Sequence, residues 1–204
     1  MPPSNRRLQQ LIYGWNNDGW SASVEFMHEM MARAAQARGS ILDCGSGLST
    51  VLLGLVAERT GSTVWSLEHQ AFWAGRIAAS LARHDVRRVH VCHAPLRSFG
   101  AFDWYDVDAA ALPTDIALVI CDGPPEDTRG GRYGLLPVMR HHLAPGCVIL
   151  LDDAARAAER RVLDQWAREL GTTYRVASGA KPFAQLVVPE VLPSEVAERS
   201  QAFP

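Results

Sequence analysis

The most constraining feature of this chain is a repeated alternation of short apolar segments with longer segments that carry a helical pattern of apolar residues. Neighbouring parallel strands need a crossover of about a dozen residues or more, usually a helix. The alternation therefore predicts a doubly wound α/β sheet with helices on both faces. We expect strands at 40–44, 63–68, 88–94, 115–122 and 147–153, and helices at 23–37, 49–61, 69–85, 132–146 and 154–171, the fourth kinked or begun at Pro137.

Two further strand-like segments, 173–179 and 183–188, close the pattern without a helix between them. A connection this short joins antiparallel strands. We therefore expect a sheet whose final strand runs antiparallel to the others.

Composition limits the kinds of partner this chain can have. Its 204 residues suit one domain, and a net charge of −2 gives no electrostatic case for binding nucleic acid or an anionic membrane. No apolar stretch reaches the roughly 18 residues of a membrane span, and the polar first ten residues do not resemble a signal peptide. We expect a cytoplasmic protein, with a homodimer as one candidate assembly. The predicted parts are an N-terminal arm and helix covering the active site (1–39), a main domain (40–188) and a C-terminal tail (189–204).

The four cysteines form no CxxC pair, and each lies in or beside an apolar segment. Reduced cysteine behaves as a small hydrophobic residue, so we expect buried free thiols rather than disulfides or a zinc site. The residues are Cys44, Cys92, Cys121 and Cys147.

The segment ILDCGSGLST, residues 41–50, predicts a tight turn between a strand and a helix, where ligands bind in an open α/β sheet. Gly45 and Gly47 allow close backbone approach there. A phosphate loop of the form GxxxxGK[ST] is excluded because the lysine is missing. A dinucleotide fingerprint GxGxxG would need glycine where Thr50 stands, so a nicotinamide-dependent dehydrogenase is a weaker alternative.

Two acidic residues flank this turn. Asp43 precedes it, and a carboxylate there would repel a pyrophosphate but could pair with the ammonium group of S-adenosylmethionine. Glu68 ends the second predicted strand 21 residues after Gly47, close to the spacing of about 20 at which an acid binds ribose hydroxyls. Together they favour an adenosine-bearing ligand with a positive charge.

From Ile41 to about Val188 the chain resembles the class I S-adenosylmethionine-dependent methyltransferases. The resemblance is carried by LDCGSGLST, VWSLEH, LVICDGPP and LAPGCVILLDD, in this order. It implies a Rossmann-like seven-stranded sheet with the last strand antiparallel. It also implies S-adenosylmethionine as cofactor, with the glycine turn at the methionine end, Glu68 on the ribose, and the residues around His93 and Ala94 near the adenine. The implied cofactor-binding residues are Asp43, Gly45, Ser46, Gly47, Ser49, Glu68, His69, Ala94 and Asp122.

Three aspartates follow the fourth and fifth predicted strands, which are neighbours in that architecture. Asp122 ends the fourth strand and is our catalytic candidate, while Asp152 and Asp153 end the fifth. Carboxylates that converge repel one another, and Mg²⁺ favours such oxygen ligands. The arrangement is similar to the metal-dependent O-methyltransferases of the catechol and sugar types, which implies a metal site at Asp122, Asp152 and Asp153. The alternative is that Asp152 and Asp153 cap the following helix.

Two other segments have two interpretations each, and a third has one. The aromatic residues of YGWNNDGWS (13–21) could cover the active site or pack the arm onto the domain. The loop 122–134 could bind an acceptor through Arg129, Arg132 and Tyr133, or be solvated. The charged segment 156–161 predicts a solvated helix face.

The hypothesis that follows is methyl transfer from S-adenosylmethionine to a hydroxyl of a small molecule, assisted by a divalent metal. The acid cluster favours oxygen as the acceptor atom, and no NPPY-like segment typical of nitrogen-methylating enzymes is present. Two alternatives stay open: a metal-independent N- or carboxyl-methyltransferase, and a non-catalytic adenosine-binding protein of the same fold.

Overall fold

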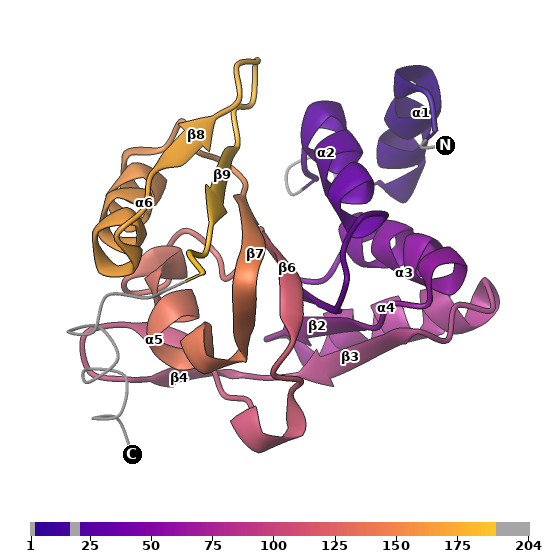
Figure 1. Cartoon of the computed structure of the whole chain (residues 1–204). Coiled ribbons are helices and arrows are strands. Elements are labelled where there is room, and N and C mark those ends of the chain that lie inside the picture. The colour runs from indigo at the N-terminus through magenta and orange to yellow at the C-terminus, as the bar shows by residue number, and fades with distance from the viewer. Residues whose placement is uncertain (1–2, 17–20, 191–204) are drawn as a thin grey trace.

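A computed structural model describes residues 3–16 and 21–190 of the chain, and its centre is one twisted sheet (Figure 1). In spatial order the strands are β3 (Val89–His93), β2 (Val64–Glu68), β1 (Ser40–Cys44), β6 (Ile116–Cys121), β7 (Leu143–Leu151), β9 (Ala184–Val187) and β8 (Tyr174–Val176). All seven strands expected from the sequence are present in this sheet.

The strand directions also agree with the prediction. Five strands of this sheet, β1, β2, β3, β6 and β7, pair in parallel, whereas β9 runs antiparallel to both β7 and β8. The connection from β8 to β9 is too short for a crossover, so β9 has to reverse direction. The result is the predicted Rossmann-like seven-stranded sheet.

Helices cover both faces of the sheet (Figure 1). One face carries α1 (Asn5–Trp15), α2 (Val24–Ala34), α3 (Leu48–Thr60) and α4 (Ala71–Arg83), and the other carries α5 (Leu135–Met139) and α6 (Ala157–Leu170). The sequence patterns predicted α2, α3, α4 and α6, but not α1.

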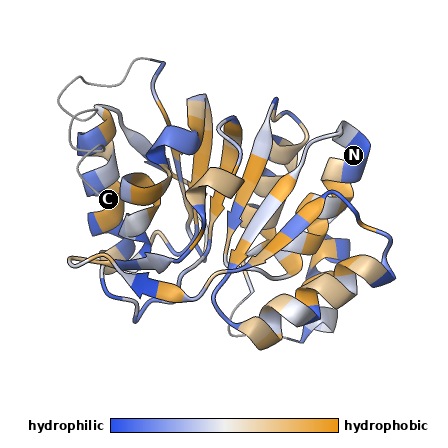
Figure 2. Ribbon diagram, turned by 90° about the horizontal axis from the view of Figure 1, so that it is seen from below, coloured by the Kyte–Doolittle hydropathy of each residue, from blue (hydrophilic) through white to orange (hydrophobic). Residues whose placement is uncertain are grey.

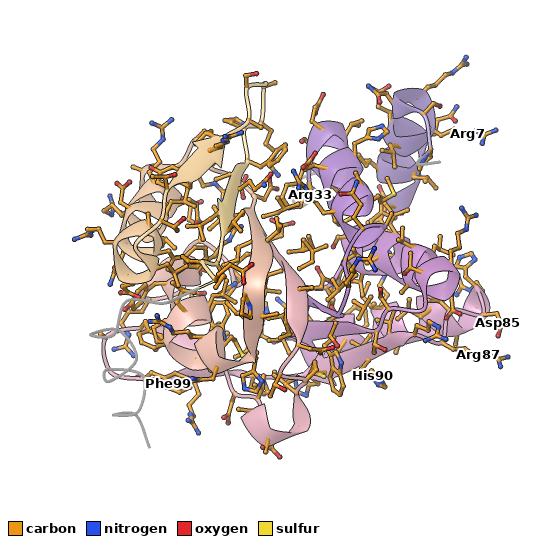
Figure 3. All side chains as sticks on the ribbon, in the orientation of Figure 1. Arg7, Arg33, Asp85, Arg87, His90 and Phe99 are labelled. Carbon is orange, nitrogen blue, oxygen red and sulfur yellow. The ribbon has the colours of Figure 1, made fainter. Side chains whose placement is uncertain are left out.

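The central strands are buried on both sides because their apolar residues alternate between two cores. In β6, Leu118 and Ile120 pack toward α2 and α3, whereas Val119 and Cys121 pack toward α5 and α6. Figure 2 shows the resulting concentration of apolar residues in the strands. Charged residues such as Arg7 and Arg87 point away from the body of the molecule (Figure 3). This pattern is the one expected of parallel strands covered on both faces.

The expected helix at 132–146 is interrupted. It is replaced by the short 3₁₀ helix η2 (Gly131–Gly134), by α5, and by a second 3₁₀ helix η3 (Arg140–His142), after which β7 begins. Pro137 lies in the first turn of α5, where its missing N–H leaves no hydrogen bond unmade. The predicted start of the helix near Pro137 is therefore close to the observed one, but the predicted helix, 132–146, is longer than α5.

One small sheet was not predicted. The strands β4 (Leu96–Ser98) and β5 (Asp103–Tyr105) pair antiparallel, and the 3₁₀ helix η1 (Ala109–Ala111) follows them. Each strand has three residues, which is too short for an alternating pattern to be visible.

The cysteine prediction is confirmed for disulfides, since all four thiols are free; three are buried and Cys92 is partly exposed. Within residues 3–16 and 21–190, no helix has the length and apolar character needed to cross a membrane.

Candidate active site

The glycine turn after β1 lies against the chain segment that follows β6. Gly45 has a φ of +92°, and a Cβ there would stand 3.0 Å from the backbone nitrogen of Gly123. A Cβ on Gly123 would in turn lie 2.4 Å from the hydroxyl of Tyr105. The backbone nitrogen of Gly123 donates to the carbonyl oxygen of Cys44 at 2.6 Å. Only glycine at both positions allows this close approach.

Asp43 holds the turn from inside the protein. Its Oδ2 accepts hydrogen bonds from the hydroxyls of Thr50 at 2.6 Å and Ser66 at 2.9 Å, and the Thr50 oxygen accepts from the backbone nitrogen of Gly47 at 2.9 Å. Burial raises the pKa of Asp43 to about 7, although both hydroxyls oppose that shift. Asp43 is fully buried, and its Oδ1 has no hydrogen-bond partner among the described residues.

Glu68, at the end of β2, is bound to the same turn. Its Oε2 accepts from the backbone nitrogen and the hydroxyl of Ser46, at 3.1 and 2.7 Å, and its Oε1 accepts from the backbone nitrogen of Gln70 at 2.8 Å. The Nδ1 of His69 lies 3.1 Å from the same Oε1. The indole nitrogen of Trp73 donates to the carbonyl oxygen of Ser46 at 2.6 Å. The turn and the end of β2 therefore form one hydrogen-bonded unit.

A cavity of about 340 Å³ opens at this edge of the sheet. Of the predicted cofactor-binding residues, the cavity is lined by Gly45, Ser46, Gly47, Ser49, Glu68, His69 and Asp122. Asp43 and Ala94 are buried and do not line it. The backbone nitrogen of Ala94 instead donates to the carbonyl oxygen of Glu68 at 2.7 Å, so this residue supports the end of β2.

The N-terminal part of the chain contributes to the lining of this cavity. Trp15 and Met27, from α1 and α2, line it together with Ser21 and Ala22. The guanidinium carbon of Arg76 lies 6.0 Å from the ring centre of Trp15 and 4.8 Å from that of Trp73, which connects α1 to α4. Trp15 therefore fits both interpretations of the aromatic segment, since it lines the cavity and also packs the N-terminal arm onto the domain. Trp20 lies outside the described residues.

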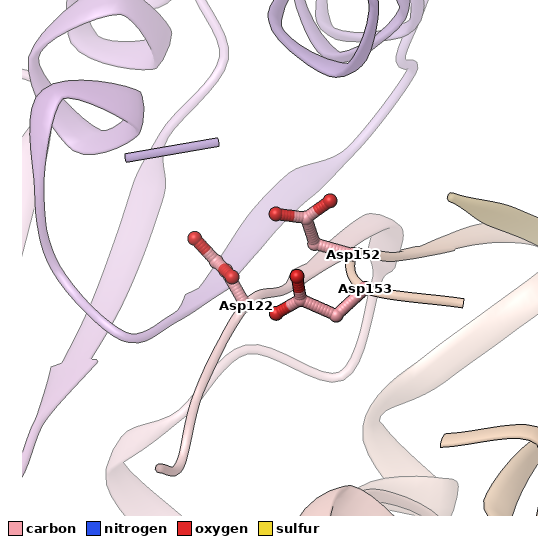
Figure 4. A group of neighbouring side chains, drawn as sticks. All are labelled: Asp122, Asp152 and Asp153. Carbon is pink, nitrogen blue, oxygen red and sulfur yellow. The ribbon is translucent and has the colours of Figure 1, made fainter. Parts of the chain in front are cut away.

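The three predicted aspartates do converge. Asp122, Asp152 and Asp153 each offer one carboxylate oxygen, and these oxygens lie within 4.8 Å of one another (Figure 4). Asp153 adopts a φ of +60°, a left-handed conformation that aspartate tolerates better than most residues. The capping alternative is not realised, because Arg156 stands at the N-cap of α6 and no side chain caps that helix.

A buried arginine crosses this cluster. The Arg132 guanidinium donates to the carbonyl oxygens of Asp152 and Asp122, both at 2.7 Å. Its Nη2 also lies 3.3 Å from carboxylate oxygens of Asp122 and Asp153, and its Nε lies 3.7 Å from Glu159. Arg132 thereby joins the ends of β6 and β7 and neutralises part of their charge.

A second cation comes from the loop between β8 and β9. The Nζ of Lys181 lies 2.8 Å from Oδ2 of Asp152 and 3.4 Å from Oδ1 of Asp153. Sequence reasoning missed Lys181, because nothing local marks a lysine in a hairpin loop as part of a site. It also missed Tyr105 and Trp73, which line the cavity from β5 and α4.

Asp122 is the member of the cluster that faces the cavity. Burial raises its pKa to about 7, and the neighbouring Asp152 adds to the shift while Arg132 opposes it. This carboxyl group can therefore take up or release a proton near neutral pH.

The contacts of Arg129, Arg132 and Tyr133 do not support the acceptor-binding interpretation of the loop 122–134, and the solvated-face prediction for 156–161 fails at Glu159. Arg132 is buried against the acids rather than offered to an acceptor, and the hydroxyl of Tyr133 donates to Glu169 of α6 at 2.8 Å. Arg129 is occupied by Asp103 and Ser98. Glu159, expected on a solvated helix face, is buried beside Arg132. In each case the side chain contacts a residue that is distant in the sequence.

Several solved structures with similar folds are methyltransferases. The O-methyltransferase TomG from Streptomyces achromogenes, solved in complex with SAM, has 17% identity and a TM-score of 0.61, over 93% of this chain and 91% of that one. The O-methyltransferase from Bacillus cereus, in complex with SAH, has 16% identity and a TM-score of 0.58 over 92% of each chain. The C-terminal domain of precorrin-6Y C5,15-methyltransferase from Rhodobacter capsulatus has 17% identity and a TM-score of 0.60, over 86% of this chain and 94% of that one.

These likenesses establish the fold. A comparison with curated protein sequences found no match. The methyltransferase domain family, in contrast, matches residues 42–154, which is more than half of the chain and includes the glycine turn, Glu68 and the three aspartates. The chain belongs to the methyltransferase domain family.

Proposed function

We propose that this protein transfers a methyl group from S-adenosylmethionine to a hydroxyl of a small molecule. The observation that carries the proposal is one cavity bordered by the glycine turn, by the Glu68 carboxylate and by Asp122. The similar structures of the O-methyltransferases TomG, in complex with SAM, and that from Bacillus cereus, in complex with SAH, support the same chemistry.

The cavity residues fit this cofactor. The turn at Gly45 and Gly47 presents backbone rather than side chains to the cavity, and Glu68 offers a carboxylate at the strand end where an acid accepts ribose hydroxyls. Ser46, Ser49 and His69 also line the cavity. Asp43 and Ala94 would act on the cofactor indirectly, through the turn and the end of β2.

When bound, S-adenosylmethionine supplies a methyl group on a positively charged sulfur. Asp122 would orient the acceptor hydroxyl and accept its proton while the oxygen forms its bond to the methyl carbon and the carbon–sulfur bond breaks. A carboxyl group whose pKa is about 7 suits this role at neutral pH. The Asp122 carboxylate would hold the acceptor in this cavity, so that part of its contribution would be orientation.

The acceptor is proposed to be small because the cavity, lined in part by Trp15 and Met27, has a volume of about 340 Å³. In the described part of the chain, no second domain offers a surface for a macromolecule. A homodimer and a cytoplasmic location stay predictions, which sedimentation and cell fractionation would test.

The chemistry of Asp122, Asp152 and Asp153 supports Mg²⁺ at this site, because three carboxylate oxygens within 4.8 Å of one another are suitable ligands. Two protein cations argue against it: Lys181 and Arg132 already contact these carboxylates. The geometry of the donors fits a metal, but the local charge does not. We therefore assign no step of the reaction to a metal.

Calorimetric titration of the purified chain with S-adenosylmethionine, S-adenosylhomocysteine and NAD tests the proposal. We expect micromolar binding of the first two and none of NAD. A panel of phenolic, sugar and carboxylate acceptors with radiolabelled cofactor then separates hydroxyl from nitrogen or carboxyl transfer. Failure to bind either S-adenosyl compound would overturn the proposal, and binding without turnover of any acceptor would favour a non-catalytic adenosine-binding protein.

A further inference from the structure

We propose that Lys181 is a built-in cation of the active site, which occupies the place among the aspartates that a divalent metal would take and makes the enzyme metal-independent. This proposal rests on the proposed function for its catalytic part. Its structural part, competition between Lys181 and a metal ion, stands on the contacts alone.

The first observation is the position of the ammonium group. It bridges Oδ2 of Asp152 and Oδ1 of Asp153, at 2.8 and 3.4 Å. Arg132 bridges the other side of the cluster, from Asp122 to Asp153. Each of the three carboxylates thus has a cation contact within 3.4 Å that comes from the chain itself.

The second observation is that this residue is the one lysine in a sequence that contains nineteen arginines. An arginine has a planar guanidinium that binds two oxygens side by side, whereas a lysine ammonium is a compact charge that can sit between carboxylates. The Lys181 ammonium is such a compact charge, and it contacts both Asp152 and Asp153.

The third observation is the burial of Asp152. Its side chain has no exposure to solvent, so its charge needs a cation close by. Neither carboxylate oxygen has another side-chain or backbone hydrogen-bond donor among the described residues. Lys181 is the cation in ion-pair contact with it.

The backbone holds Lys181 in this place. The carbonyl oxygen of Pro182 accepts from the backbone nitrogen of Ala154 at 2.9 Å, and that of Phe183 accepts from the nitrogen of Ala177 at 2.8 Å. The loop is therefore closed on itself and attached just beyond the two aspartates. These two hydrogen bonds fix the backbone beside Lys181, so its contact with the aspartates does not depend on an unattached loop.

Lys181 also connects the acid cluster to the cover of the cavity. Its Nζ donates to the carbonyl oxygen of Ser21 at 3.2 Å, and Ser21 lines the cavity. The same ammonium group therefore contacts the carboxyl end of β7 and the segment before α2. We assign it a positioning role for the acceptor side of the cavity.

The local charge shows why lysine and metal exclude each other. Four carboxylates gather here, from Asp122, Asp152, Asp153 and Glu159, and Arg132, Arg156 and Lys181 contact them. A divalent ion held by Asp152 and Asp153 would have a like charge within a few Å, since Nζ already lies at these oxygens. Removing Lys181 would leave four negative carboxylates and two positive arginines. A divalent ion could balance the negative charge that remains.

The test compares the wild type with Lys181→Met, which keeps most of the side-chain volume without charge. Mn²⁺ binding is measured by electron paramagnetic resonance and calorimetry. We expect K181M to bind Mn²⁺ at least about tenfold more tightly than the wild type, since a repelling charge has gone. The matched control is K181M with Asp152→Asn, which should lose the gained site. Equal affinity in wild type and K181M would overturn the proposal.

A measurement on the wild type alone does not depend on the variant folding. Growth on ¹³C-lysine gives one side-chain ε-carbon signal, because the chain has one lysine. We expect Mn²⁺ to leave this signal sharp, whereas an ion among the aspartates would broaden it or shift it as Lys181 is displaced. Broadening at stoichiometric Mn²⁺ would contradict the proposal whether or not an acceptor has been found.

Activity supplies the last readout. Wild-type turnover should be insensitive to EDTA. K181M should lose at least about tenfold in kcat and recover part of it with Mg²⁺ or Mn²⁺, while Lys181→Arg should keep more activity than K181M without metal. Loss of wild-type turnover in EDTA, restored by Mg²⁺, would overturn metal independence but leave methyl transfer itself intact.

Discussion

Ser46 donates two hydrogen bonds to one carboxylate oxygen of Glu68, from its backbone nitrogen at 3.1 Å and its hydroxyl at 2.7 Å. This contact ties the glycine turn after β1 to the end of β2. The carboxylate that we assign to the ribose is thereby oriented before any ligand arrives, which lowers the entropy lost on binding.

Replacing Glu68 by Ala should therefore weaken cofactor binding strongly. A charged hydrogen bond contributes about 1.5–3 kcal/mol, so we expect Kd for S-adenosylmethionine to rise roughly 10- to 100-fold. Ser46→Ala should weaken cofactor binding less, because it leaves the backbone donor in place. Calorimetry measures both, with Glu58→Gln on the exposed end of α3 as the control. Unchanged affinity in Glu68→Ala would remove Glu68 from the binding site.

Asp122→Asn tests the assigned proton acceptor. General base catalysis contributes about 10²–10⁴ in rate, so kcat should fall by that range while cofactor affinity changes little. Because the pKa of Asp122 is raised to about 7 and the base must be ionised, wild-type kcat/KM should rise with pH and level off above about 7. The variant should lack that rise. A variant that loses affinity and kcat together would instead point to a structural role.

Asp43 should make the ligand-free protein less stable as pH rises. Burial raises its pKa from 3.8 to about 7, so the folded protein holds a proton that the unfolded chain has released. The stabilising effect is complete below about pH 4 and is lost as pH rises through 7, by up to roughly 4 kcal/mol. Urea unfolding at pH 5 and 8 measures this change.

Asp43→Asn provides the comparison for that measurement. It keeps an oxygen for Thr50 and Ser66 but has no proton to lose. We expect the variant to gain stability relative to the wild type between pH 5 and 8. If the difference in unfolding free energy between the variant and the wild type stayed constant from pH 5 to 8, Asp43 would not titrate in this range.

Arg132→Met should destabilise the fold. It removes the buried cation that joins the strand ends at Asp122 and Asp152, and breaking a buried ion pair from one side costs about 3–5 kcal/mol. Arg129→Met is the matched control, since Arg129 is largely exposed and surface pairs contribute about 1 kcal/mol or less. Urea unfolding of both variants gives the free energies. Similar losses in the two variants would mean that Arg132 contributes no more than a surface arginine.

Much of the fold was predictable because its signals are local. The five parallel strands and the final antiparallel strand follow from apolar segments and from the lengths of the connections between them. The helix α1 and the pair β4–β5 were missed, since α1 is largely polar and exposed, with Leu8 as its buried residue, and each of the two strands has three residues. Short or polar elements form when the rest of the protein offers them a surface.

The site likewise has a part that the sequence predicted and a part that only the structure shows. Sequence spacing, together with the resemblance to class I methyltransferases, predicted that the glycine turn, Glu68 and the three aspartates lie at one edge of the sheet, because parallel strands bring their carboxyl ends together. Only the tertiary structure decided which charges meet those acids. Arg132, Glu159 and Lys181 come from the 3₁₀ helix η2, from α6 and from the hairpin loop between β8 and β9, and no local pattern encodes their meeting. Side-chain ion pairs depend on packing between distant elements, so charge balance at this site is a property of the folded chain.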